Sequence, residues 1–364
     1  MKTFANLMEE IVTPRRCHRC GGCVAFCTAI NFGALELDDD GKPRFKEQEK
    51  CIECGLCYEI CPEIDNIRQE TKQRLGWTAP MGRVLDIAMA RAQDPRLLMN
   101  ARDGGVLTAL LLHLYDSGRI DGAIVTKRVE PFTCAPLLAT TRQEIIDAGG
   151  FHFDAVAGVS LVGERYSVNS PFMELMTPLA RKELRRIAFV GRPCQIETMR
   201  RMETLGIVPS DAVKYYFGLY CRGNFRFGEK EKTLMEKAGG FKWDQVRKVN
   251  FKKGLQVHLK SGEIKVIDFD TLEPIKRRAC RYCADFGSEF ADIACGGVGT
   301  IEGWTNVILR TPLGRAVFLD AAEEKLEVYK NKNDPDRQAK LLNEVRTLSL
   351  AKKEMSERNR KESP

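Results

Sequence analysis

Residues 17–27 read CHRCGGCVAFC, and residues 51–61 read CIECGLCYEIC. The two runs share the pattern C-x-x-C-x-x-C-x-x-x-C, so the segment that holds them is an internal duplication, which defines the unit of structure. Eight of the 14 cysteines lie in these runs. A chain of 364 residues can bury a sizeable core without disulfides, so its many thiols indicate either a secreted, cross-linked protein or metal binding.

The cellular compartment decides between disulfides and metal. Residues 1–16 contain neither the apolar core and cleavage site of a signal peptide nor a Ser-rich transit peptide. No stretch reaches the roughly 18 consecutive apolar residues of a membrane span, and the densest covers residues 104–115. We therefore expect a cytoplasmic protein without direct membrane insertion, with peripheral attachment to a membrane complex as the alternative. In that compartment thiols stay reduced, which favours metal.

The spacing of the two runs is that of two-cluster bacterial ferredoxins. In such domains three thiolates of one run and the last thiolate of the other run hold each 4Fe–4S cubane. This rule assigns one cluster to Cys17, Cys20, Cys23 and Cys61, and the second to Cys51, Cys54, Cys57 and Cys27. Structural zinc would use two C-x-x-C pairs and leave no role for the third cysteine of each run.

The composition changes after Pro80 to the alternating apolar and amphipathic segments of an α/β (α+β) body. We expect three parts: a ferredoxin domain over 1–78, a body over 79–330 and a helical tail over 331–364. The pattern predicts body helices over 104–117, capped by Asp103, and over 178–185 and 196–205. It predicts strands over 123–129, 187–190, 213–220 and 304–309, and one hairpin over 246–269. The tail carries a thin apolar seam of Leu341, Leu342, Val345 and Leu348, which suits docking on its own body or, alternatively, on a partner.

The later cysteines allow several interpretations. Cys280 and Cys283 form a lone C-x-x-C, which could be half a zinc site, a redox dithiol or half a cluster site. Cys194 lies at a predicted strand-to-helix turn, and Cys221 ends a predicted strand, so spacing alone leaves a third metal site open. We expect Cys134 and Cys295 to be buried as small apolar residues.

Five motifs follow one another through the body. They are ARDGGVLTALL (101–111), GERYSVNSP (163–171), GRPCQ (191–195), LYCRGNF (219–225) and the long block over 280–311 that begins CRYCADFGSEF. Through them, the region from residue 81 to about 353 resembles the coenzyme F420 hydrogenase/dehydrogenase beta-subunit family. With the ferredoxin runs in front, the chain is similar to the electron-input subunits of complexes that oxidise reduced F420.

The resemblance implies an oxidoreductase of archaeal methanogenesis that uses FAD and iron–sulfur clusters. It implies a third 4Fe–4S cluster on Cys194, Cys221, Cys280 and Cys283. It also implies FAD contacts at Gly104, Gly105, Thr108, Arg165, Tyr166, Ser167, Ser170, Gly297 and Gly299. There is no G-x-G-x-x-G, so we expect no Rossmann FAD site. We expect no catalytic side-chain triad either, because the hydride would pass directly to N5 of FAD.

The function we expect is oxidation of reduced F420, with FAD converting a hydride into single electrons for the three clusters. The acceptor would be a soluble ferredoxin or another subunit of an electron-transfer complex. One alternative is the reverse flow, with a hydrogenase, formate dehydrogenase or heterodisulfide reductase partner; another is a flavin-free electron relay. The 57 basic and 50 acidic residues are interleaved, as in GEKEKTLMEK (228–237), so we expect no nucleic-acid partner.

Overall fold

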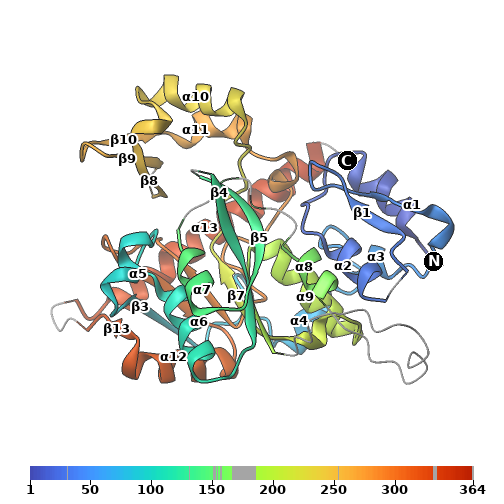
Figure 1. Cartoon of the computed structure of the whole chain (residues 1–364), viewed down its shortest axis with the longest axis horizontal. Coiled ribbons are helices and arrows are strands. Elements are labelled where there is room, and N and C mark those ends of the chain that lie inside the picture. Colours follow the sequence, from blue (N-terminus) through green and yellow to red (C-terminus); the bar gives the residue numbers. More distant parts are fainter. Residues whose placement is uncertain are drawn as a thin grey trace.

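The computed structural model describes residues 1–30, 32–130, 132–150, 153, 155, 158–165, 186–252, 254–330 and 334–362 (Figure 1). Its centre is an eight-stranded mixed sheet with the order β13-β3-β12-β11-β7-β6-β4-β5. The strands are β3 (Asp86–Ala92), β4 (Gly122–Glu130), β5 (Thr133–Ala139), β6 (Ile187–Gly191), β7 (Val213–Leu219), β11 (Ile293–Gly296), β12 (Thr305–Leu309) and β13 (Leu326–Val328). Strands β4, β6, β7 and β11 pair in parallel, and the remaining pairs are antiparallel.

Helices cover both faces of this sheet, which confirms the expected mixed α/β class. The first face carries α5 (Pro95–Asn100), α6 (Val106–Asp116), α7 (Arg142–Asp147) and α12 (Pro312–Glu324), and α6 and α12 bury apolar side chains against it. The second face carries α8 (Ser160–Arg165), α9 (Pro193–Leu205) and α13 (Arg337–Glu362), with Ile196, Met199, Leu341 and Val345 in its core.

Local sequence explains where these helices begin. Pro193 and Pro312 occupy first helical positions, where the missing N–H costs nothing, and the Thr311 hydroxyl caps α12 by accepting from Gly314 N. The predicted cap of α6 was wrong: Gly105, with φ 69°, precedes the helix, and the Asp103 carboxylate instead accepts from Asn250. The expected helix over 178–185 lies outside the described residues.

The amino-terminal segment packs on the second face of the body. It contains α1 (Phe4–Leu7), a π-helix (Met8–Val12), α2 (Gly22–Ala29), β1 (Leu35–Leu37), β2 (Pro43–Phe45), a 3-10 helix (Gln48–Lys50), α3 (Leu56–Glu59) and α4 (Arg68–Arg74). Two glycines allow the close contact: a Cβ at Gly22 would lie 2.2 Å from Thr198 Cγ2, and one at Gly163 would lie 2.2 Å from Ala25 O.

A small lobe lies beyond the carboxyl ends of the central strands, at the top of Figure 1. It consists of α10 (Glu229–Gly239), the sheet β8 (Val246–Phe251), β9 (Leu255–Leu259) and β10 (Ile264–Ile267), α11 (Phe269–Leu272), and 3-10 helices at Trp243–Gln245 and Glu273–Ile275. The single hairpin expected here was incomplete, because β9 pairs with β8 as well as with β10. Further 3-10 helices span Ser210–Ala212 and Arg278–Arg281. We call residues 225–275 the aromatic lobe, since Phe225, Phe227 and Phe241 fill its core.

The tail forms the helix α13, and its predicted seam docks on the body. Leu341 and Val345 are fully buried, while Leu342 and Leu348 pack beside them. No helix within the described ranges has the length and apolar character needed to cross a membrane.

Candidate functional site

The first eight cysteines form two groups, which we call the inner quartet (Cys17, Cys20, Cys23 and Cys61) and the outer quartet (Cys27, Cys51, Cys54 and Cys57). Burial raises the pKa of Cys23, and the other three inner thiolates raise it further. Burial also raises the pKa of Cys57 to about 12, and the other three outer thiolates add to that shift. Thiolates repel one another in this way only at short range, so the inner cysteines lie near one another and so do the outer ones.

A glycine turns each run into a short helix. Gly21 (φ 88°) precedes α2, and Gly55 (φ 72°) precedes α3, and both adopt the left-handed conformation that suits glycine. A Cβ at Gly55 would also lie 2.7 Å from the carbonyl oxygen of Lys2. These turns bend each run, so that cysteines three and four residues apart lie on one short stretch of turn and helix.

The body brings together a third group, the body quartet of Cys194, Cys221, Cys280 and Cys283. Burial raises the pKa of Cys194, and the thiolates of Cys283 and Cys221 raise it further. Burial raises the pKa of Cys283 to about 11, with Cys221 and Cys280 among the further causes. Asn224 N donates to Cys280 Sγ over 3.2 Å. These four positions were implied by resemblance alone, and the fold gathers them from three separate segments.

Each quartet has the donor set of an iron–sulfur cubane, four clustered thiols. Among the described residues, no three His, Cys, Asp or Glu side chains converge on a position for one metal ion. A cubane does not need such convergence, because each thiolate binds a different iron atom. All fourteen cysteines lie in the described part of the chain and are free thiols.

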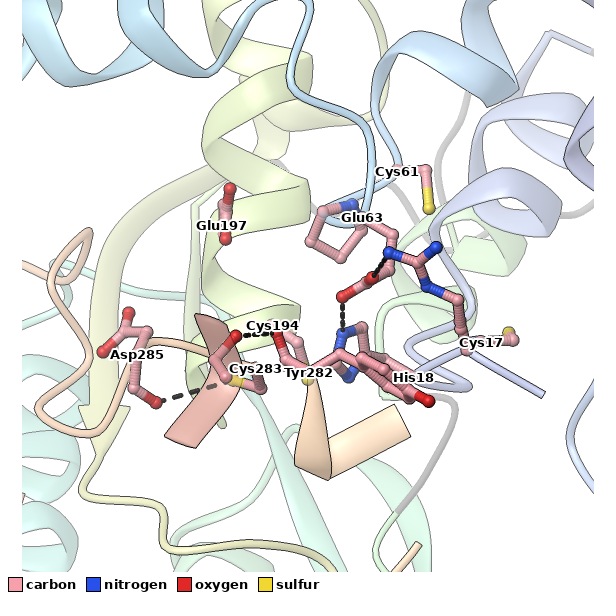
Figure 2. Close-up of polar contacts among 12 residues, drawn as sticks. Cys17, His18, Cys61, Glu63, Cys194, Glu197, Tyr282, Cys283 and Asp285 are labelled. Carbon is pink, nitrogen blue, oxygen red and sulfur yellow. Dashed lines mark hydrogen bonds and ion pairs between the residues drawn. The ribbon is translucent and has the colours of Figure 1, made fainter. Parts of the chain in front are cut away.

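The inner and body quartets meet at the junction between the amino-terminal segment and α9 (Figure 2). Cys20 Sγ lies 3.4 Å from Thr198 Oγ1, and that hydroxyl donates to the carbonyl oxygen of Cys194 over 2.8 Å. Figure 2 shows His18 and Glu63 between the two quartets, joined by a bond of 2.8 Å from His18 Nε2 to Glu63 Oε1. The inner quartet in turn neighbours the outer one, since the Cys57 thiolate also raises the pKa of Cys23.

A cavity of about 290 Å³ opens on the other side of the body quartet. Its wall includes Gly191, the last residue of β6, and residues that directly follow the parallel strands: Arg192 after β6, Tyr220 and Cys221 after β7, and Gly297 after β11. Ligands of open α/β sheets bind at this carboxyl edge. Cys221 therefore belongs both to the body quartet and to the cavity wall.

The cavity wall combines aromatic rings, positive charge and a helix N-terminus. Phe153, Phe225, Phe251 and Phe269 enter it from the aromatic lobe and the segment beside it, and Tyr220 and Phe286 from the body. Arg102, Arg192, Arg222 and Lys252 also line it, with Arg222 stacked 3.7 Å from the centre of the Phe269 ring. Gly105 and Val106, at the N-terminus of α6, also line the wall, and the first hydrogen bond of this helix runs from Ala109 N to Gly105 O. Such a wall suits an anionic cofactor with a planar ring.

The predicted FAD residues divide into three sets. Gly105, Thr108 and Gly297 line the cavity. Gly104 and Gly299 do not: Gly104 N donates to Thr305 Oγ1 over 2.9 Å, and a Cβ at Gly299 would lie 3.2 Å from Leu341 on α13. These two glycines allow packing rather than ligand contact. Arg165 ends α8, but its side chain, Tyr166, Ser167 and Ser170 lie outside the described residues.

Several lining residues were not singled out from the sequence. Arg192 and Arg222 sit beside the cysteines of GRPCQ and LYCRGNF, so their motifs were the available signal. Phe251 and Phe269 come from the aromatic lobe, where no motif marks them. Cys295 is buried as expected and faces the cavity, whereas Cys134 is only half-buried and donates to Phe153 O.

Family models match three regions of the chain. The coenzyme F420 hydrogenase/dehydrogenase beta-subunit N-terminal model matches residues 87–162, and the C-terminal model of that subunit matches residues 184–334. A 4Fe-4S dicluster domain model matches residues 9–62, the segment with the inner and outer quartets.

Individual proteins resemble the chain over most of its length. The coenzyme F420 hydrogenase beta subunit of Methanococcus voltae is 29% identical, covering 77% of this chain and 95% of that protein. A subunit of the F420H2 dehydrogenase of Methanosarcina mazei is 24% identical over 89% of this chain and 87% of its own. The coenzyme F420-dependent sulfite reductase of Methanocaldococcus jannaschii is 27% identical over 92% of this chain, which spans half of that protein.

A solved structure shares the fold. A chain of the F420-reducing [NiFe] hydrogenase complex from Methanosarcina barkeri superposes with a TM-score of 0.68 and 25% identity, covering 79% of this chain and 94% of that one. The matches to the family models and the shared fold both agree with the family that the motifs of the body indicated. The chain belongs to the coenzyme F420 hydrogenase/dehydrogenase beta-subunit family and carries a 4Fe–4S dicluster segment at its amino-terminal end.

Proposed function

We propose that this protein is the electron-input subunit of an F420-dependent oxidoreductase. It oxidises reduced F420 by hydride transfer to FAD in the 290 Å³ cavity, and it sends single electrons through three 4Fe–4S clusters to a ferredoxin or a partner subunit. Bound FAD would supply the change from a two-electron hydride to single electrons. The observation that carries the proposal is the position of Cys221, in the cavity wall and in the body quartet at once.

The order of the groups supports a single path for electrons between the cavity and the surface. The body quartet adjoins the inner quartet through Cys20 and Thr198, and the inner adjoins the outer through Cys23 and Cys57. Ile52, next to Cys51 of the outer quartet, is 58% exposed. The path therefore runs from a cavity inside the body to a surface where an acceptor could dock.

The residues of the cavity would bind and orient the two ring systems. The α6 N-terminus and Arg192 suit a pyrophosphate, because N–H dipoles and a guanidinium both stabilise phosphate charge. Phe251 and Phe269 offer ring faces and exclude water from the reacting atoms. The cations Arg222 and Lys252 suit the anionic tail of F420. No side chain has to move a proton, so no catalytic residue is assigned.

We prefer oxidation of reduced F420 over the reverse reaction because of the relatives that match most of this chain. The dehydrogenase subunit and the sulfite reductase cover 89% and 92% of it, and both names describe use of reduced F420 or of F420 as a reductant. The hydrogenase beta subunit covers 77%.

The test is anaerobic purification followed by assays of FAD, iron and F420 turnover. We expect about twelve irons and one FAD per chain, and we expect methyl viologen to be reduced to its coloured form only when reduced F420 is supplied as donor. Thr108→Trp places a ring in the cavity, and should lower bound FAD at least tenfold while the irons remain. Thr233→Trp, on the exposed side of α10, is the matched control. A protein without FAD and without F420 turnover would overturn the proposal.

A further inference from the structure

Helix α13 connects the body to the amino-terminal segment. It begins at Arg337, three residues beyond the last position matched by the family models, and runs for 26 residues. Its first turns bury Leu341 and Val345 against the central sheet, and its carboxyl end lies beside the amino-terminal segment in Figure 1. The helix is therefore a feature of this chain that the family models do not describe.

The last turns of α13 are fixed to the loop that carries Cys280 and Cys283. Ser356 Oγ donates to Tyr282 O over 2.5 Å, and Asn359 Nδ2 donates to Arg281 O over 2.8 Å. Arg360 Nη2 donates to Tyr282 O and also pairs with the Glu63 carboxylate over 3.0 Å. These bonds hold the helix in register with the body quartet.

Lys352 lies on the stretch of α13 that passes the body quartet. Its Nζ donates to Cys221 O and to Asp285 O, each over 2.7 Å, and the residue is only 6% exposed. The amine is thus bonded to the main chain of Cys221, a member of the body quartet, and to the main chain two residues after Cys283, another member. Both acceptors are carbonyls, which accept from two of the three N–H donors of the ammonium group without cancelling its charge.

A buried cation needs a nearby negative charge, because its loss of hydration is otherwise too costly. The Lys352 amine contacts the main-chain oxygen of Asp285 rather than its carboxylate, and a carbonyl dipole is a weak counter-ion. Four cluster-bound thiolates are a stronger one.

We propose that Lys352 is a positioning residue for the flavin-side cluster: its fixed charge raises the reduction potential of the cluster held by the body quartet. One electron that enters the cluster from the flavin adds one negative charge and forms no bond. A cation bonded to the main chain beside the cluster ligands stabilises the reduced cluster more than the oxidised one. The inference rests on the proposed function, since it requires the third cluster.

The experiment is a mediated redox titration of the full chain, followed by electron paramagnetic resonance. The signal that Cys283→Ala removes identifies the flavin-side cluster. Lys352→Gln keeps a donor and removes the charge, and it should lower the reduction equilibrium constant of that cluster at least tenfold, which is ~59 mV for one electron. Lys352→Arg keeps the charge and should stay within threefold of the wild type. Lys340→Gln, on the exposed start of α13, should change nothing.

Iron analysis separates the outcomes. Loss of about four irons in Lys352→Gln, with all irons kept in Lys352→Arg, also supports the proposal, since the charge is then needed to hold the cluster. A complete cluster with an unchanged potential in Lys352→Gln overturns the inference and leaves the proposed function standing. Loss of the cluster in both variants overturns it too, because α13 then acts by packing. Wild-type protein with only about eight irons overturns the third cluster and the inference together.

Discussion

The inner and outer quartets differ from the body quartet in how the chain assembles them. Two runs of eleven residues, 17–27 and 51–61, supply the first eight cysteines, and a glycine with positive φ turns the chain within each run. The body quartet takes Cys194 from the start of α9, Cys221 from the end of β7, and Cys280 and Cys283 from a loop held by α13. The inner and outer quartets therefore depend on local spacing, whereas the body quartet depends on the packing of the whole body.

The largest expected effects come from removing one cysteine on each side of this comparison. Cys54→Ala should lose about four irons and keep its FAD, because the outer quartet lies apart from the cavity. Cys221→Ala should lose about four irons and also bind FAD more weakly, since Cys221 lines the cavity. Iron and flavin contents of anaerobically purified protein measure both effects.

Cys134→Ser is the control, because Cys134 belongs to no quartet and should leave both contents unchanged. A Cys54→Ala protein that loses its FAD would break the distinction between a local and an assembled site.

A smaller but still large effect is expected at the junction between the two regions. The buried Glu197 accepts from Arg68 of α4 over 2.9 Å and from Arg201 over 2.7 Å. Burial raises the pKa of Glu197, but the charges of Arg68 and Arg201 outweigh it and hold the pKa at about 2. The two ion pairs of Glu197 therefore stabilise the fold fully at pH values above 4.5, the usual carboxyl pKa. This stability is lost as the pH falls toward 2.

Glu197→Gln leaves the fully buried guanidinium of Arg201 without its anion, while Arg68 keeps its ion pair with Asp65, and it should cost about 3 kcal/mol at neutral pH. Guanidinium-induced unfolding, followed by the visible absorbance of the clusters, measures this loss. Glu36→Gln breaks an exposed ion pair with Arg44 and should cost less than about 1 kcal/mol. Equal losses in the two variants would contradict the role of Glu197 at the junction.

Close packing at the same junction gives the next effect. A Cβ at Gly163 of α8 would lie 2.2 Å from Ala25 O and 2.6 Å from Ala25 Cα, and main-chain atoms cannot move aside. Gly163→Ala should therefore cost about 1–3 kcal/mol and loosen the contact with α2. Hydrogen exchange of residues 22–29 measures the loosening.

Gly228→Ala, where a Cβ would meet only the flexible end of Glu231, is the control and should leave that exchange unchanged. Unchanged protection in Gly163→Ala would show that the amino-terminal segment does not depend on this contact.

The dicluster segment could be predicted from the sequence because its information is local. Cysteine spacing within 17–27 and 51–61 is enough to group eight residues, and Gly55 explains the turn within the second run. The central strands over 123–129, 187–190, 213–220 and 304–309 were also found, since apolar runs between turn residues are typical of buried strands. The seam of α13 was found through its helical period.

The assembled site could not be worked out in this way. The spacing of Cys194, Cys221 and Cys280 does not indicate that α9, β7 and a loop, respectively, place them together. Only the motifs pointed to these cysteines. Gly104 and Gly299 were expected at a ligand and pack on β3 and α13 instead, because a glycine needed for close packing looks the same in sequence. Lys352 carried no signal at all, since charged residues are common on a polar helix.

The smallest expected effect tests the body far from every quartet. Burial and the neighbouring Arg119 lower the pKa of His113 on α6. The Nε2 atom of His113 lies 2.6 Å from Arg119 Nη2. The unfolded chain therefore binds this proton more readily than the folded one, so His113 lowers stability as the pH falls below its usual value of 6.5. Because the side chain is partly exposed, the loss should be less than about 1 kcal/mol. His113→Gln removes it, and the unfolding free energies of the two proteins should differ more at about pH 5.5 than at about pH 7.5. A difference that does not change with pH would contradict the lowered pKa of His113 in the folded chain.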